Sequence, residues 1–204
     1  MSDTYPSLPD VTGMSQRAAA KAQRRVELLN AAAAIMAAKG FHGTRLEDIG
    51  EAVGISGPAV YRHFPSKEVI LEELLTGISE HLLAESKQML AGIDDPRDQL
   101  EILIDFHVNF AITKSELIRL HQRELFRLDA TGLERVRTAQ GRYLRLWAKA
   151  LQNFDASFQA EAGRITAQLV TGMINASQNT SKWAGEALLR RQMTLCARAA
   201  VGLR

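Results

Sequence analysis

Two short helical segments separated by a glycine, between Thr44 and Phe64, restrict the fold of this chain more than any other feature. Thr44 and Glu47 have the spacing of a capping box, in which a hydroxyl and a carboxylate satisfy the free amides of a first helical turn. Gly54 interrupts this helix, and Ser56 is placed to cap the next one. Two short helices joined by a glycine-containing turn are typical of a helix-turn-helix, whose second helix enters the major groove of DNA.

The rest of the chain has the periodicity of helices, and no segment alternates with the period of a strand. Alanine and leucine are abundant and β-branched runs are missing, which favours an all-α protein. Lys39 before Gly40 is a typical helix end, and Asp95 before Pro96 is a typical helix start. We expect further helices over residues 17–39, 67–91, 96–112, 115–127, 131–153, 157–179 and 183–202.

Positive charge is concentrated around the helix-turn-helix. The formal net charge of the chain is only +2, but residues 15–67 hold eight Lys and Arg against four Asp and Glu. A local basic excess beside a compact helical motif favours a polyanion as partner.

Other classes of protein lack support in the sequence. The single cysteine, Cys196, permits no disulfide within the chain, and we expect it to be a buried apolar residue. We find no Cys/His metal spacing, no Ser/His/Asp arrangement and no phosphate loop, so we expect no catalytic residue, no metal and no cofactor. With neither a signal peptide nor an apolar run of the roughly 20 residues that span a bilayer, we expect a cytoplasmic protein.

The second helix of the motif carries the side chains that suit DNA. Small residues at its start allow close approach to the bases, and Tyr61, Arg62 and His63 offer hydrogen-bond donors and aromatic surface. Lys67, at the start of the next helix, opposes the helix dipole, which a phosphate partner would offset. Lys67 also fits a solvated surface lysine, and Arg24 and Arg25 fit either phosphate contacts or the polar face of the first helix.

The stretch GFHGTRLEDIGEAVGISGPAVYRHFPSKEVIL, residues 40–71, resembles the tetracycline-repressor (TetR) family of bacterial regulators. Gly50 and Val53 stand where the family usually has alanines, and Ile55 replaces the usual valine. The resemblance implies a homodimer that binds an inverted-repeat operator and is released by a small effector. The positions that match the family's DNA contacts are Thr44, Arg45, Ser56, Gly57, Pro58, Ala59, Tyr61, Arg62, His63 and Lys67.

The same resemblance divides the chain into three parts. We expect a flexible tail over residues 1–16, a DNA-binding domain over 17–70 with its motif at about 45–64, and a ligand-binding and dimerisation domain over 71–204. In the family the last two long helices pair with their copies in a second subunit, although each apolar stripe also fits a core. The expected dimerisation residues are Ile165, Leu169, Met173, Ala176, Leu188, Leu195 and Ala199.

An effector pocket is expected between the helices that start at Pro96, Ser115 and Thr131, closed by the helix that starts near Asp155. Its polar members also fit exposed residues or structural pairs. The expected lining is Leu103, Phe106, His107, Phe110, Leu117, His121, Glu124, Phe126, Tyr143, Leu144, Trp147, Met173 and Asn175.

Residues 104–125 and 135–151 resemble actinobacterial members of the family that are linked to acyl-CoA catabolism. This resemblance suggests an acyl-CoA or fatty acid derivative as the effector of a transcriptional repressor. The alternative is a ligand-binding or architectural DNA-binding protein without effector-dependent repression.

Overall fold

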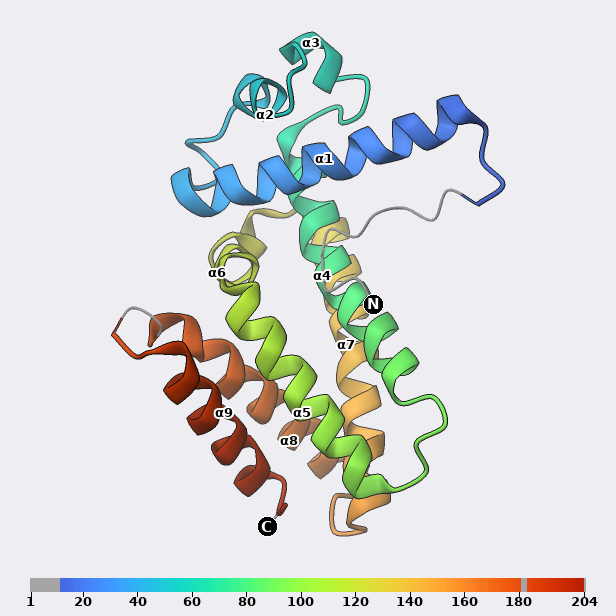
Figure 1. The fold of residues 1–204 in the computed structure, drawn as a ribbon, viewed down its shortest axis with the longest axis vertical. Helices are drawn as coiled ribbons and strands as arrows, with labels where there is room; N and C mark the ends of the chain where they lie inside the picture. The colour runs from blue at the N-terminus through green and yellow to red at the C-terminus, as the bar shows by residue number, and fades with distance from the viewer. Residues whose placement is uncertain (1–11, 181–182, 204) are drawn as a thin grey trace. The chain divides into compact units, whose positions relative to one another are not determined.

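The computed structural model describes residues 12–180 and 183–203, which contain α-helices and short 3₁₀ turns but no strand. This confirms the all-α prediction, while the predicted tail falls mostly on residues 1–11, outside the described part. The elements are α1 (Gln16–Lys39), α2 (Leu46–Ala52), α3 (Gly57–Val60), α4 (Lys67–Met89), α5 (Pro96–Thr113), α6 (Ser115–Glu124), η1 (Leu125–Arg127), α7 (Ala130–Phe154), α8 (Ala160–Asn175), η2 (Ala176–Asn179) and α9 (Glu186–Ala200) (Figure 1).

The chain forms two compact units, and three of its helices contribute to both. Among the described residues, unit 1 comprises 12–78 and 119–136, and unit 2 comprises 79–118 and 137–203. This division differs from the boundary expected at residue 71, because the end of α6, η1 and the start of α7 belong with the N-terminal helices.

Unit 1 has its core where α1, α2 and α3 meet. From α1, Leu28 and Met36 are fully buried, and Ile49 of α2 and Val60 of α3 are buried equally. The two short helices approach so closely that a Cβ on Gly50 would lie 2.8 Å from both the Ile55 carbonyl oxygen and Val60 Cγ2. Glycine is therefore required at position 50, where the TetR family usually has alanine.

The predicted capping box at the start of α2 is wrong. The helix begins at Leu46, and Arg45 is its N-cap residue. The backbone amide of Arg45 donates to Asp48 Oδ2 at 3.4 Å. Thr44 is buried, and its hydroxyl instead donates to the Gly40 carbonyl oxygen at 2.7 Å. Gly40 ends α1 with φ 77°, the left-handed region that its sequence position predicted.

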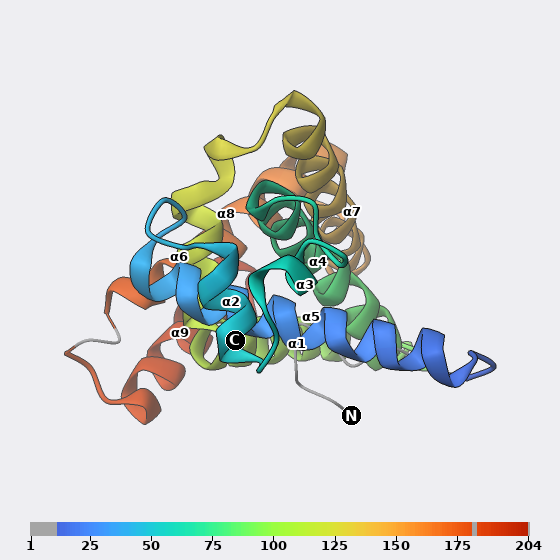
Figure 2. The same cartoon turned by 90° about the horizontal axis from the view of Figure 1, so that it is seen from above.

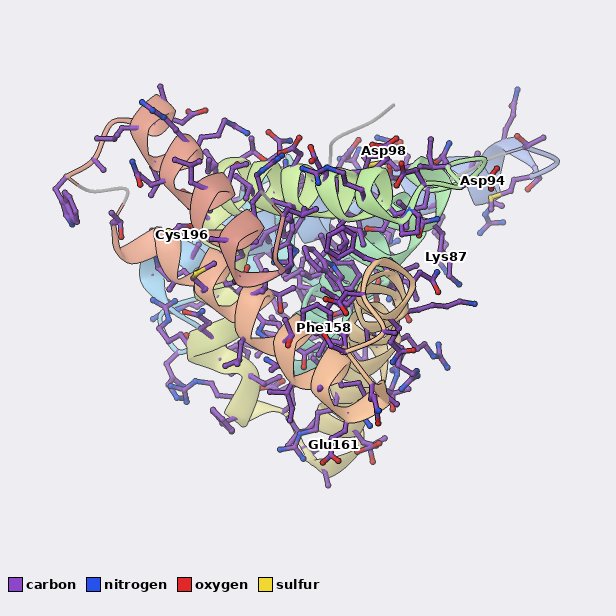
Figure 3. The ribbon with its side chains drawn as sticks, turned by 90° about the horizontal axis from the view of Figure 1, so that it is seen from below. Lys87, Asp94, Asp98, Phe158, Glu161 and Cys196 are labelled. Carbon is purple, nitrogen blue, oxygen red and sulfur yellow. The ribbon has the colours of Figure 1, made fainter. Side chains whose placement is uncertain are left out.

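In unit 2, α9 packs along α5 and α8 (Figure 1). Asp95 caps α5 as predicted, since its carboxylate accepts from the Arg97 amide at 2.7 Å. The predicted helix 157–179 is shorter, because α8 ends at Asn175 and continues as the 3₁₀ turn η2. Cys196 is exposed on α9 (Figure 3), so the expectation that it is buried is wrong.

None of the helices in the described part of the chain is both long and apolar enough to cross a bilayer.

Candidate DNA-binding surface and distal polar cluster

The start of α3 and the turn after it form an exposed surface, residues 56–63, which we call the recognition surface. Val60 and Phe64 are fully buried and anchor it. The backbone of α3 lies beside α2 (Figure 2). Between these anchors Tyr61 is 53% exposed, and Arg62 is exposed beside it. Because Val60 and Phe64 point into the core, Tyr61 and Arg62 between them point outward.

The start of α3 is crowded against α2. A Cβ on Gly57 would lie 2.9 Å from Glu47 Cγ, so the small residue predicted here fits a close approach between the helices. Ser56 has the extended backbone of an N-cap residue, but its side chain makes no cap hydrogen bond. Its hydroxyl is exposed, as are Pro58 and Arg45.

His63 lies in a positive field. Burial lowers the pKa of its imidazole, and the positive charges of Lys21, Arg25, Arg24 and Arg62 lower it further. The buried Nδ1 atom of His63 has no hydrogen-bond partner among the described residues. Five basic groups close together in unit 1 are an arrangement that a bound polyanion would stabilise.

Arg25 is engaged inside unit 1. Its guanidinium donates to both carboxylate oxygens of Glu73 and to the His63 carbonyl oxygen. The same group lies 4.0 Å from the centre of the Phe64 ring. Arg25 therefore positions the end of the recognition surface, and its role as a phosphate contact stays a prediction.

Arg24 and Lys67 are also engaged internally. Arg24 donates to the Val53 carbonyl oxygen at 3.0 Å, at the end of α2. Lys67 Nζ donates to the carbonyl oxygens of Phe41 and Thr44 at 3.1 and 3.2 Å and lies 4.6 Å from the Phe41 ring centre. A phosphate at Lys67 would add to these contacts, whereas the buried Thr44 hydroxyl is no longer a candidate contact.

A polar cluster lies inside unit 2, formed by Ser86 of α4, His107 of α5, Tyr143 and Trp147 of α7, and Asn175 of α8. His107 Nδ1 lies 3.0 Å from the Tyr143 hydroxyl, and His107 Nε2 lies 3.2 Å from Asn175 Oδ1. Ser86 and Trp147 are fully buried, and His107 is 2% exposed. Burial lowers the pKa of His107 to about 4, so its imidazole is neutral at neutral pH.

The polar cluster contains three residues of the predicted effector lining besides His107, and apolar members of that lining are buried in the same unit. Sequence reasoning missed Ser86, because its neighbours Glu85, Lys87 and Gln88 are typical of an exposed face. The buried apolar members in unit 2 are Leu103, Phe106, Phe110 and Leu117.

Other predicted lining residues lie elsewhere. Phe126 is 79% exposed in η1, and Met173 is 40% exposed on α8. Leu144 is half-buried and borders a surface hollow of about 420 Å³ between α7 and α8. Glu124 and His121 belong to unit 1, so they are not part of the cluster in unit 2.

The predicted dimerisation residues form an exposed apolar face on α8 and α9, which we call the apolar face. Leu169 is 66% exposed, Ile165 54%, Leu188 56% and Leu195 50%. On the opposite side of the same helices, Ala167 and Ala197 are fully buried. The apolar face is therefore not part of the core of unit 2.

Two family models match the chain. Residues 28–74 match the model described as "Bacterial regulatory proteins, tetR family". Residues 93–183 match "Tetracyclin repressor-like, C-terminal domain".

Curated relatives and solved structures agree with these models. The HTH-type transcriptional repressor KstR2 of Rhodococcus jostii is 30% identical over 164 residues, which cover 78% of this chain and 76% of that protein. The solved ketosteroid transcriptional regulator KstR2 of Mycobacterium tuberculosis has a TM-score of 0.70 at 21% identity, over 88% of this chain and 93% of the other. The structure of AibR in complex with isovaleryl coenzyme A and operator DNA has a TM-score of 0.70 at 16% identity, over 84% and 96%.

Proposed function

The chain belongs to the TetR family and is a transcriptional repressor of that family, and we propose that a homodimer of it binds an inverted-repeat operator and leaves when a small effector occupies unit 2. The recognition surface is the observation that carries this proposal. Tyr61 and Arg62 face outward between two buried anchors, and basic groups surround the adjacent His63. This surface has the size and chemistry of a major-groove helix.

The exposure and size of each residue on the recognition surface suggest its role in DNA binding. Tyr61 and Arg62 reach base edges or phosphates, while the small residues Gly57 and Ala59 permit close approach of the backbone. Ser56 and Arg45 are exposed near the starts of α3 and α2 and hold phosphates there. Arg25, with its contacts to Glu73, Phe64 and the His63 carbonyl, fixes the orientation of the surface.

Substitution of Tyr61 tests the recognition surface. Tyr61→Ala should weaken binding to an operator duplex by about tenfold or more, because one good base contact contributes about 1–3 kcal/mol. Tyr61→Phe separates the hydroxyl from the ring, and the melting temperature of both variants should remain that of the wild type, because the side chain is exposed. Fluorescence anisotropy on a duplex selected from random sequence measures the affinity.

Arg62→Ala tests the electrostatic contribution of the recognition surface to DNA binding. If Arg62 binds a phosphate, its loss reduces the slope of log affinity against log salt by about one per site. Arg142→Ala, at an exposed arginine of α7 in unit 2, is the matched control. Wild-type affinity in both Tyr61→Ala and Arg62→Ala would show that DNA binds elsewhere.

The effector proposed for unit 2 is an acyl-CoA or fatty acid derivative. Two fold neighbours were solved with such molecules, since AibR holds isovaleryl coenzyme A and the FadR of Bacillus subtilis holds stearoyl-CoA. In this chain, Leu103, Phe106 and Phe110 of α5 provide buried apolar surface in the same unit as the polar cluster. An acyl chain among these residues, with its polar end at the cluster, is the arrangement that we propose.

The homodimer is proposed to form through the apolar face. Four exposed leucine and isoleucine side chains on two adjacent helices are unusual for a surface in contact with water. Pairing α8 and α9 with their copies would remove this area from water and place two recognition surfaces in one molecule.

A further inference from the structure

The beginning of α1 extends beyond α2 and α3 (Figures 1 and 2). Residues 16–21 are all exposed except Ala19, so apolar burial does not hold this part of the helix. It is helical because three of the six residues are alanine, the best helix former, and because Ser15 accepts from the Ala18 amide at 3.3 Å. Unit 1 therefore contains about two turns of helix that its core does not use.

These turns carry positive charge and no acidic residue. Residues 12–26 contain four Lys and Arg and no Asp or Glu. Arg17, Lys21 and Arg25 are four residues apart, so they form a row along one side of α1. The first turn, which contains Arg17, has no acid, although the helix dipole favours acids there. An anion beside Arg17 would offset this unfavourable interaction.

One end of the row is fixed at the recognition surface. Arg25 donates to the His63 carbonyl oxygen, at the end of that surface. Arg17 and Lys21 are exposed, and they make no hydrogen bond or ion pair with any residue that the structure describes. After burial, the positive charge of Lys21 is the next cause that lowers the pKa of His63, so Lys21 lies near the same surface.

We propose that Arg17 and Lys21 bind the phosphates that border each half of the operator, as an extension of the recognition surface along α1. This inference rests on the proposed function and adds a second contact region to unit 1. With a rise of 1.5 Å per residue, Lys21 lies about 6 Å and Arg17 about 12 Å along α1 from Arg25. The major groove is about 12 Å wide, so these distances lead from the groove to the phosphates at its border.

The size of α1 favours phosphates over base edges as its partners. An α-helix with its side chains is about 10–12 Å across, whereas the minor groove is about 6 Å wide. With α3 in the major groove, the start of α1 therefore remains outside both grooves, along the sugar-phosphate backbone. Contacts of this kind release counterions and increase the affinity for DNA of any sequence.

The double variant Arg17→Gln/Lys21→Gln removes both charges and keeps good helix formers. A dimer of it loses four phosphate contacts, so the slope of log affinity against log salt should fall by about three to four. Its affinity for the selected operator should fall about tenfold or more in anisotropy. Arg142→Gln/Lys149→Gln, at two exposed cations of α7 in unit 2, is the matched control and should change neither quantity.

Neutral phosphates supply the complementary change on the DNA. Methylphosphonate linkages at the phosphates that border the inverted repeat should weaken binding of the wild type and leave binding of the double variant nearly unchanged, because the two changes remove the same contacts. A mismatched base pair inside the repeat should cost both proteins the same factor, since phosphate contacts carry no sequence information.

The outcomes separate this inference from the proposed function. Wild-type affinity and salt slope in the double variant, while Tyr61→Ala still loses operator binding, would overturn the inference and retain the function. Independent effects of the double variant and the methylphosphonates, or an altered preference among the bases of the repeat, would also overturn it. If no inverted repeat is enriched, the proposed function fails, whereas a reduced salt slope of the double variant on random duplexes would still support the phosphate contacts.

Discussion

At the scale of single residues, His107 links the core of unit 2 to acid stability. Burial lowers the pKa of its imidazole from 6.5 to about 4, against the opposing effects of Asn175 and the Thr171 backbone. In the unfolded chain the same group takes up a proton near pH 6.5. Between pH 6.5 and 4 the unfolded state therefore binds more protons, so stability falls as the pH is lowered through this window.

His107→Gln should remove this part of the pH dependence. A difference of 2.5 in pKa corresponds to about 3 kcal/mol, which the wild type loses between pH 7 and 4 and the variant does not. Urea unfolding at a series of pH values measures the free energies, and an NMR titration gives the pKa of His107 directly. Parallel profiles for the two proteins would contradict the assignment.

His121 needs to be separated from this effect, because burial lowers its pKa to about 4 as well. His121→Gln is therefore the comparison variant. The difference between His107→Gln and the wild type should remain when both carry His121→Gln.

At the scale of elements, the end of α6 is held to unit 1 by a buried carboxylate. Glu124 is 2% exposed and accepts from the Phe41 amide at 3.4 Å, just after α1 ends. Arg123 and Arg127 both donate to it, and Arg123 also donates to the Met36 carbonyl oxygen at 2.7 Å. The corner after α1 is thereby joined to residues more than 80 positions away in sequence.

Glu124→Gln should destabilise this junction. The neutral amide loses charge-assisted hydrogen bonds, so the free energy of unfolding of unit 1 should fall by about 1–3 kcal/mol. Amide hydrogen exchange at Phe41 should become faster. Glu116→Gln, an exposed position of the same helix, is the control and should change neither quantity.

The pH profile offers a second check on Glu124. Burial raises the pKa of its carboxyl, but Arg127, Arg123 and the Phe41 amide outweigh burial and lower it below 4.5. The carboxylate therefore contributes stability above pH 4.5, and this contribution is lost as the pH falls through the lowered pKa. Unchanged Phe41 exchange in Glu124→Gln would mean that other contacts hold the junction.

The helices could be predicted from sequence because their apolar periodicity and end signals are local. Gly40 and Asp95 fulfil their predicted roles as helix end and helix cap. Thr44 does not cap α2 as its spacing from Glu47 predicted, because its hydroxyl donates to the Gly40 carbonyl oxygen instead. A single sequence does not weigh two such local partners against each other.

The site residues were harder to predict because their partners are distant in sequence. Arg25 contacts Glu73, 48 positions away, and Lys67 contacts Phe41, 26 positions away, so the sequence indicates neither partner. Phe126 fits an apolar helical stripe, but the chain has left the α-helix there and the ring is exposed. The spacing of the two short helices predicts the position of the recognition surface, whereas the contacts of the nearby cations depend on residues distant in sequence.

At the scale of the whole molecule, two-fold pairing through the apolar face is what would turn one recognition surface into an operator-binding protein. Leu169→Lys should convert the dimer to a monomer at micromolar concentration, because an ammonium group at the centre of an apolar interface lacks a partner. Lys149→Glu, at an exposed residue of α7, is the control for altered charge. Sedimentation velocity measures the mass, and a Leu169→Lys protein that remains dimeric would place the interface elsewhere.

The proposed activity is sequence-specific DNA binding that an effector reverses, and selection from random duplexes measures both parts of it. The protein is used to enrich binding sites from random duplexes, and the enriched pool is then bound with and without octanoyl-CoA or octanoate. We expect a single inverted repeat that Tyr61→Ala fails to enrich and that one of the two probes releases. Enrichment of no common sequence, or an inverted repeat that neither probe releases, would contradict it.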